Sequence, residues 1–252
     1  MALIVKVAVV LSVFLFNYNQ VRAETGNLSV LQFDFEPWGY LEDGKPTGVF
    51  VEFLEALSKE SGVPIDIKIV PYARMRALLQ KGLSDFAIFS PNGLDENEYI
   101  SVAPVYKIKF VVVARGRDLT AYEQLIGETV GVPRGARLGH RFDDDTRIVK
   151  RQITNYKQGI KLLRHNRLTY LAGSELTILN EVWKSKLPLR QFGKRLKLNY
   201  IVTAIQFSKL SENKWAIPEI SKAAKRLFSE GFIENSIKKH FPEEVIDEVR
   251  SF

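Results

Sequence analysis

The segment from residue 65 to 89, IDIKIVPYARMRALLQKGLSDFAIF, decides the fold class of this chain. Its isoleucines alternate with polar residues over 65–70, which predicts a half-buried strand. Apolar residues at helical spacing follow and end at Gly82, and residues 85–89 are rich in apolar residues, as is typical of a buried strand. A strand and a helix also occupy residues 28–62, so the order is β-α-β-α-β. This order predicts a mostly parallel sheet covered by helices.

A second α/β series follows downstream. Residues 128–132 predict a strand, 133–139 a glycine-rich turn, and 168–172 a further strand. Residues 199–207 predict a returning strand. No Pro/Gly/Ser-rich linker separates the two series, so we expect two lobes that are joined by more than one crossing of the chain.

Composition excludes several classes of protein. The chain has 252 residues, with 46% apolar and 26% charged residues, which is typical of a globular protein. It has no cysteine, which excludes a disulfide scaffold and a cysteine nucleophile. The net charge of +7 is spread along the chain, so we expect no nucleic-acid partner. The three histidines lie far apart and no nucleotide or hydrolase motif is present, so we expect no metal and no cofactor.

The first 23 residues differ from the rest. Lys6 precedes an apolar run over 7–16, and Val21-Arg22-Ala23 suits a signal peptidase. A run of about 10 residues is too short to span a bilayer, which takes about 20. We therefore expect residues 1–23 to be a signal peptide that is cleaved after Ala23, with the mature protein in the periplasm. An uncleaved membrane anchor is the alternative.

Three stretches together resemble family 3 of the extracellular solute-binding proteins, which serves polar amino-acid transporters. They are residues 28–53 with an aromatic-Glu-Pro-Trp loop, residues 71–106, and residues 128–174. The resemblance implies the two-lobed type II periplasmic binding fold, an α/β fold in which each lobe is a mostly parallel sheet flanked by helices. The implied bounds are 24–113 and 203–252 for lobe 1, 117–198 for lobe 2, and 114–117 and 198–203 for a two-crossing hinge.

The resemblance also implies a role and partners. A small-molecule solute would lie in the cleft between the lobes, and closure about the hinge would bury it. A membrane permease of an ABC importer would then recognise the closed form of a monomeric binding protein.

Candidate ligand-binding residues fall near the expected strand ends, where open α/β sheets bind ligands. Aromatic faces after the first strand can stack on a ligand, and an arginine fork suits a carboxylate. The resemblance further implies small polar groups after the third strand, and an acid that faces the ligand ammonium. The candidates are Phe35, Trp38, Tyr72, Arg74, Ser90, Asn92, Arg137 and Glu175.

The chain departs from the family pattern at Asp95. The resemblance places there the arginine that clamps the ligand α-carboxylate in amino-acid binders. Arg74, and Arg137 at an expected helix start, can replace that arginine. We therefore expect an anionic or zwitterionic solute. If neither arginine binds it, a cationic or neutral solute that stacks on the aromatic loop and faces Glu175 is the alternative.

Two other functions remain open at this point. The same fold hosts periplasmic dehydratases, and Glu175 would then be the acid that protonates a leaving hydroxyl. A ligand-sensing protein that docks on a membrane receptor is the other. No enzymatic signature appears in the sequence, so we expect a binding protein and not an enzyme.

Overall fold

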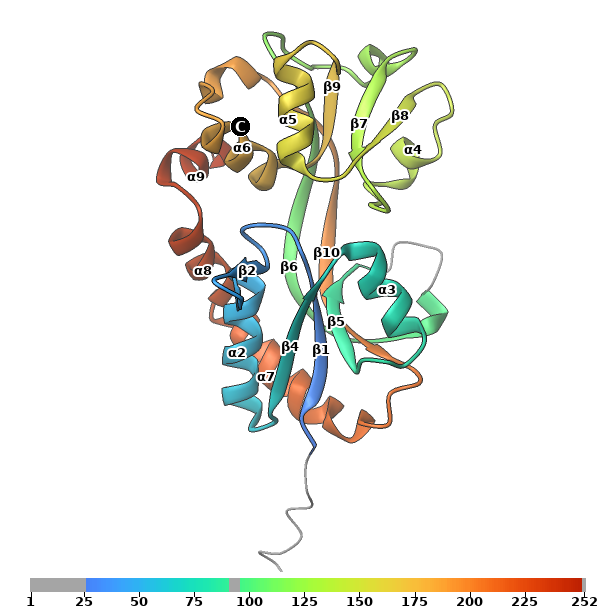
Figure 1. Cartoon of the computed structure of the whole chain (residues 1–252), viewed down its shortest axis with the longest axis vertical. Coiled ribbons are helices and arrows are strands. Elements are labelled where there is room, and N and C mark those ends of the chain that lie inside the picture. The colour runs from blue at the N-terminus through green and yellow to red at the C-terminus, as the bar shows by residue number, and fades with distance from the viewer. Residues whose placement is uncertain (1–25, 91–95, 251–252) are drawn as a thin grey trace, which may run out of the picture.

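The computed structural model describes residues 26–90 and 96–250 and forms an elongated α/β body of two lobes (Figure 1). One eight-stranded sheet runs through both lobes in the order β4-β1-β5-β10-β6-β9-β7-β8. The fold class expected from the sequence is thereby confirmed. Within the described ranges, no helix combines the length and the apolar character that crossing a bilayer would take. The predicted signal peptide and its cleavage site lie outside the described residues.

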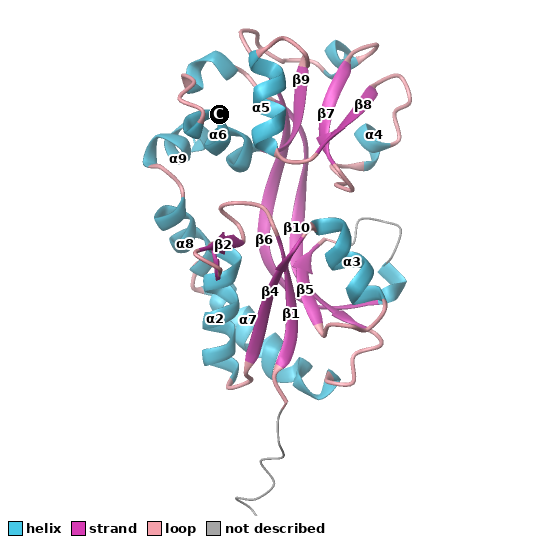
Figure 2. Cartoon of the chain, in the orientation of Figure 1, coloured by secondary structure: helices cyan, strands magenta, loops and turns pink. Residues whose placement is uncertain are grey.

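The first lobe contains the β-α-β-α-β unit that the sequence predicted. Strand β1 pairs in parallel with β4 on one side and with β5 on the other. Helices α2, α7 and α8 pack together on one side of these strands, and α3 lies on the other (Figure 2). The bounds are β1 Leu28–Phe33, β2 Tyr40–Glu42, β3 Lys45–Thr47, α2 Val49–Ser61, β4 Ile65–Val70, α3 Tyr72–Gln80, β5 Phe86–Phe89, α7 Ile217–Ser229 and α8 Phe232–His240.

The second lobe is a smaller unit of the same kind. Strand β7 pairs in parallel with β8 and β9, and α5 packs against both α6 and the strands. The bounds are β7 Thr129–Pro133, α4 His140–Asp143, β8 Val149–Ile153, α5 Tyr156–Arg164, β9 Tyr170–Ser174 and α6 Glu175–Lys184. Short 3-10 turns cover Glu96–Glu98, Tyr122–Leu125, Leu189–Phe192 and Lys214–Ala216.

Two long antiparallel strands, β6 (Tyr99–Ala114) and β10 (Leu196–Ser208), connect the lobes. Strand β10 pairs with β5 from Ala204 onward, whereas β6 pairs with β9 already at Phe110. The stretch of β6 between the lobes therefore precedes Phe110. We propose a first crossing near residues 105–109 in place of the expected 114–117, and the second crossing at 198–203 stays a prediction.

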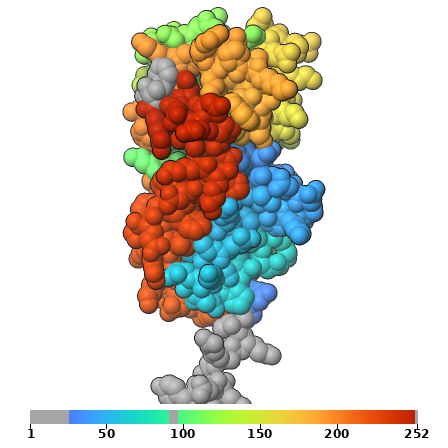
Figure 3. Space-filling model, turned by 90° about the vertical axis from the view of Figure 1, so that its left-hand side faces the viewer, coloured from blue at the N-terminus to red at the C-terminus, as the bar shows by residue number. Residues whose placement is uncertain are grey.

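The C-terminal helix forms a further connection. Helix α9 (Glu243–Arg250) follows α8 of the first lobe but packs against α6 of the second. Figure 3 shows this C-terminal segment running along one side of the molecule over both lobes. The assignment of 203–252 to lobe 1 stays a prediction, and we propose to count α9 with lobe 2 because of this packing.

Candidate ligand-binding site

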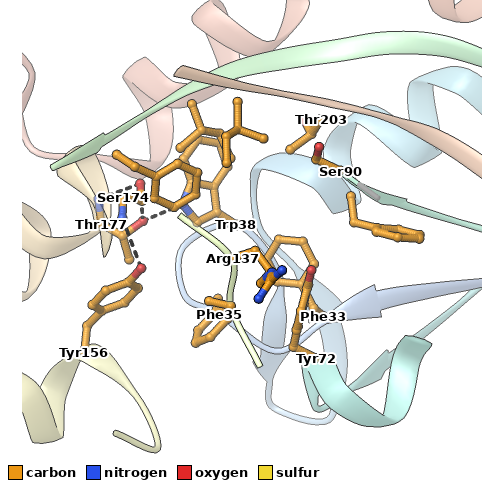
Figure 4. A pocket seen from close by; sticks show the side chains of 15 residues that line it. Phe33, Phe35, Trp38, Tyr72, Ser90, Arg137, Tyr156, Ser174, Thr177 and Thr203 are labelled. Atoms are coloured by element: carbon orange, nitrogen blue, oxygen red, sulfur yellow. Dashed lines mark hydrogen bonds between the residues drawn. The ribbon is translucent and has the colours of Figure 1, made fainter. Parts of the chain in front are cut away.

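A cavity of about 90 Å³ lies between the lobes (Figure 4). Its walls come from the carboxyl ends of β1, β5 and β9, from the loop after β7, and from the middle of β6 and β10. This is the position at which open α/β sheets bind ligands. The residues that line it are Phe33, Phe35, Trp38, Tyr72, Phe89, Ser90, Ile108, Phe110, Ala136, Arg137, Tyr156, Ser174, Thr177, Ile201 and Thr203.

Aromatic rings from both lobes meet in this cavity. The ring of Phe33 lies edge-to-face with Phe35 at 5.7 Å and with Tyr72 at 5.8 Å between centroids. The ring of Phe35 also lies 5.8 Å from that of Tyr156, which belongs to α5 of the other lobe. The tilted Phe35–Tyr156 pair places the two lobes against each other. The edge-to-face pairs within the first lobe stabilise the arrangement of its rings beyond the area that they bury.

Trp38 fixes one wall of the cavity rather than standing free to stack. Its side chain is 3% exposed and packs on Phe50 and Tyr106. Its indole N–H donates a 2.6 Å hydrogen bond to Thr177 Oγ1, which in turn donates to Ser174 Oγ at 3.0 Å. Because Trp38 belongs to the first lobe and Thr177 to the second, this hydrogen bond joins the lobes.

An ion pair joins the lobes at the rim as well. Lys184 at the end of α6 pairs with Glu36, the residue two positions before Trp38. Side chains of both lobes are therefore in direct contact beside the cavity.

Two phenols of the cavity stay neutral near neutral pH. Burial raises the pKa of Tyr156 to about 12, and it also raises the pKa of Tyr72. The Tyr156 hydroxyl accepts a 3.1 Å hydrogen bond from the Ser174 amide. The ring fits only because residue 173 is glycine, since a Cβ at that position would lie 2.3 Å from the Tyr156 hydroxyl.

Arg137 is the charged side chain among the described residues that line the cavity. It enters from the turn after β7, and the same turn brings Gly135 close to Tyr72 of the other lobe. Figure 4 shows its guanidinium beside Phe35 and Tyr72. Its Nε lies 4.0 Å from the Asp143 carboxylate, and that carboxylate also accepts hydrogen bonds from two backbone amides.

The structure thus brings five of the predicted site residues together at one cavity: Phe35, Trp38, Tyr72, Ser90 and Arg137. Asn92, like Asp95, lies outside the described residues. Arg74 is exposed and is not among the residues that line the cavity, so its role as a ligand contact stays a prediction. Tyr72 and Arg74 are two residues apart on one helix and point about 200° apart around its axis, so both cannot face the same cavity.

Glu175 is also not among the residues that line the cavity, and its role as a ligand contact stays a prediction. It begins α6, but its carboxylate turns away into a buried cluster. Arg195 Nε donates to Glu175 Oε1 at 2.7 Å, and both side chains are 1% exposed. Lys109 Nζ lies 3.0 Å from Glu175 Oε2. The carboxylate is therefore neutralised by the protein's own cations.

The same cluster ties down the C-terminal helix. Arg195 also donates to the Glu248 carboxylate at 2.9 Å and to the Glu248 carbonyl at 3.0 Å. Glu175, Lys109, Arg195 and Glu248 thus form one network that links α6, β6 and α9. The network is structural, and it lies beside the cavity rather than in it.

Sequence reasoning missed several cavity residues. They sit on strands and helices that the sequence read as core, where an apolar residue gives no sign that it faces a ligand. The missed residues are Phe33, Phe89, Ile108, Phe110, Ala136, Tyr156, Ser174, Thr177, Ile201 and Thr203. Their position at strand ends could have identified some of them, because Phe33, Phe89 and Ser174 are the last residues of β1, β5 and β9.

The comparisons with known proteins agree on one family. The family model of bacterial extracellular solute-binding proteins, family 3, matches residues 30–243. The match confirms the resemblance that the sequence showed. The chain is also similar to the probable amino-acid-binding protein YxeM of Bacillus subtilis (strain 168), with 25% identity over 216 residues. That match covers 83% of this chain and 81% of YxeM.

Solved structures share the fold at low sequence identity. The substrate-binding protein of an amino acid ABC transporter matches with a TM-score of 0.66 and 19% identity, over 86% of this chain and 99% of the other. A histidine kinase sensor domain similar to periplasmic binding proteins matches with a TM-score of 0.71 and 15% identity, over 85% of this chain and 95% of the other. These matches establish the two-lobed α/β fold.

Proposed function

We propose a solute-capture role in transport for this chain, which belongs to family 3 of the bacterial extracellular solute-binding proteins. In this role the protein binds a small anionic or zwitterionic solute between its lobes and delivers it to the membrane permease of an ABC importer. The observation that carries the proposal is the cavity between the lobes, with Arg137 entering it among aromatic rings.

The positive charge of Arg137 in the cleft favours an anionic group on the solute. The Arg137 side chain is one third exposed and has the Asp143 carboxylate as a neighbour at 4.0 Å. A solute carboxylate can add charge-assisted hydrogen bonds to its guanidinium. Phe35 and Tyr72 provide flat surfaces for the rest of the solute. Solute binding then favours the closed arrangement of the lobes, which a permease can distinguish from the open one.

We propose the role of a binding protein rather than that of an enzyme. The residue that the sequence offered as a general acid is Glu175. It is held by Arg195 and Lys109 and does not face the cavity. A carboxylate held in this way is not placed to reach a solute in the cavity.

We propose export to the periplasm with cleavage after Ala23. The amino-terminal sequence of the protein that is recovered from the periplasm tests this directly. An amino terminus at Met1 would contradict it.

Lobe closure tests the binding role. Protein from a native source should be unfolded to release its bound solute, refolded, and measured by small-angle X-ray scattering. We expect a smaller radius of gyration when the released solute is added back. No change at saturation would contradict a closing clamp. Deletion of the gene should then abolish cellular uptake of that solute, whereas a loss of signalling with normal uptake would favour a sensor.

A further inference from the structure

The described walls of the cavity offer a ligand aromatic faces and one cation. The rings come from both lobes and enclose the cavity on several sides, with Phe33, Phe35 and Phe110 among them (Figure 4). The remaining polar wall groups are hydroxyls, apart from Arg137. The chemistry of those hydroxyls decides which ligands the cavity can hold.

The hydroxyls are mostly occupied by the protein itself. Thr177 Oγ1 accepts from the Trp38 indole and donates to Ser174 Oγ. Ser174 Oγ also accepts from the Thr177 amide. Thr203 donates to the Tyr106 carbonyl at 3.1 Å. A polar ligand would have to replace or share these hydrogen bonds, whereas an apolar body leaves them intact.

The described cavity lining contains no carboxylate. The nearby acids are engaged elsewhere, with Glu175 bound by Arg195 and Asp143 bound by the amides of Leu138 and Gly139. An ammonium group has three donors and needs acceptors. The described lining offers it hydroxyl oxygens but no carboxylate to compensate its charge, and the Arg137 cation in the same cavity repels it.

We infer that the cavity selects a small monocarboxylate with an apolar or aromatic body, and that it does not recognise an α-ammonium group. Arg137 binds the carboxylate, and the rings of both lobes enclose the body. We take a single ring or a short branched chain as that body, because the described wall is rich in aromatic faces. The inference rests on the proposed function. It restricts the proposed solutes to monocarboxylates and excludes standard amino acids.

The test uses three probes that share a phenyl ring on one saturated carbon. Phenylacetate has the carboxylate alone, L-phenylglycine has both charged groups, and benzylamine has the ammonium alone. Calorimetry on the mature protein after solute removal should show that phenylacetate binds at least about tenfold more tightly than either other probe. Isovalerate should bind too, as a short branched body.

A pair of variants locates the carboxylate. Arg137→Gln should weaken phenylacetate binding by about 30-fold or more, because a charge-assisted pair in a closed site is lost. Arg74→Gln is the matched control, since Arg74 is exposed on the lobe surface. It should bind phenylacetate within about twofold of the unmodified protein.

Three outcomes would overturn the inference. They are binding of L-phenylglycine as tight as that of phenylacetate, equal binding by the two arginine variants, and no binding of either carboxylate at millimolar concentration. Binding of L-glutamine or L-arginine in place of the carboxylates, with a smaller radius of gyration, would overturn the solute class and leave the proposed function standing. A released native solute that does not draw the lobes together would instead overturn the proposed function.

Discussion

Replacement of Glu175 by glutamine separates a structural role from a ligand-binding one. The change keeps the shape of the side chain and removes its charge, so that Arg195 loses the negative charge of its 2.7 Å partner and an amide NH2 group can face Lys109. Removal of one partner of a buried ion pair costs about 3–5 kcal/mol. Since Arg195 keeps Glu248 at 2.9 Å, we expect the lower end, about 3 kcal/mol. In a chain of this size that lowers the melting temperature by about 6–12 °C.

The assay is thermal unfolding followed by circular dichroism, with phenylacetate affinity measured alongside. Glu244→Gln is the control, because Glu244 is exposed on α9. We expect the control to melt within about 2 °C of the unmodified protein, as surface changes usually do. A Glu175→Gln variant that melts normally would refute the structural reading. If such a variant also binds more weakly, Glu175 would be a ligand contact after all.

Further expectations concern the lobe interface, the packing of the cavity and the response to pH. Trp38→Phe removes the indole donor to Thr177, so calorimetry should show solute binding weaker by about 2- to 12-fold, the equivalent of one hydrogen bond. Adding Thr177→Val to the Trp38→Phe variant should weaken binding little further. Fully additive losses of affinity would show that the two side chains do not interact. Gly173→Ala should displace the Tyr156 ring and lower stability by about 1–3 kcal/mol in denaturant unfolding, and an unchanged midpoint would show that the ring moves freely. Burial alone would raise the pKa of Glu52, but hydrogen bonds from Ser236 and Lys239 hold it below its usual range. Because that pKa is lower in the folded state, its stabilisation is present at neutral pH and is lost as the pH falls through the folded value. Glu52→Gln should therefore lower stability at pH 7 and converge with the unmodified protein in acid, and a constant difference across pH would contradict this reading.

Much of the fold could be predicted because its signals are local. The alternating isoleucines of β4 and the helical spacing that ends at Gly82 each lie within one short segment. The position of α9 could not be read in this way. Its apolar residues predict only that one face is buried, and the partner face on α6 lies about 60 residues away in sequence.

The site was predictable where one residue alone determined the chemistry. Arg137 follows a strand in a glycine-rich turn, and that position was enough to place it at the cleft. The exposed position of Arg74 follows from helix geometry, which directs it away from Tyr72. The ion pairs of Glu175 could not be predicted, because Arg195 and Lys109 come from distant segments and no local pattern indicates such a pair. Nothing in the sequence indicated that Tyr156 lines the cavity, because its contact with Phe35 forms between the two lobes.

Mass spectrometry of the solute that is released from natively produced protein tests the central claim most directly. The protein and its Arg137→Gln variant are purified in parallel, denatured, and their released small molecules compared. We expect a carboxylic acid with a single ring or short branched body, close to one per chain, and strongly depleted in the variant. Equal amounts of the same solute from both proteins, or a released solute without a carboxylate, would contradict the claim that the lobes close on an anion held by Arg137.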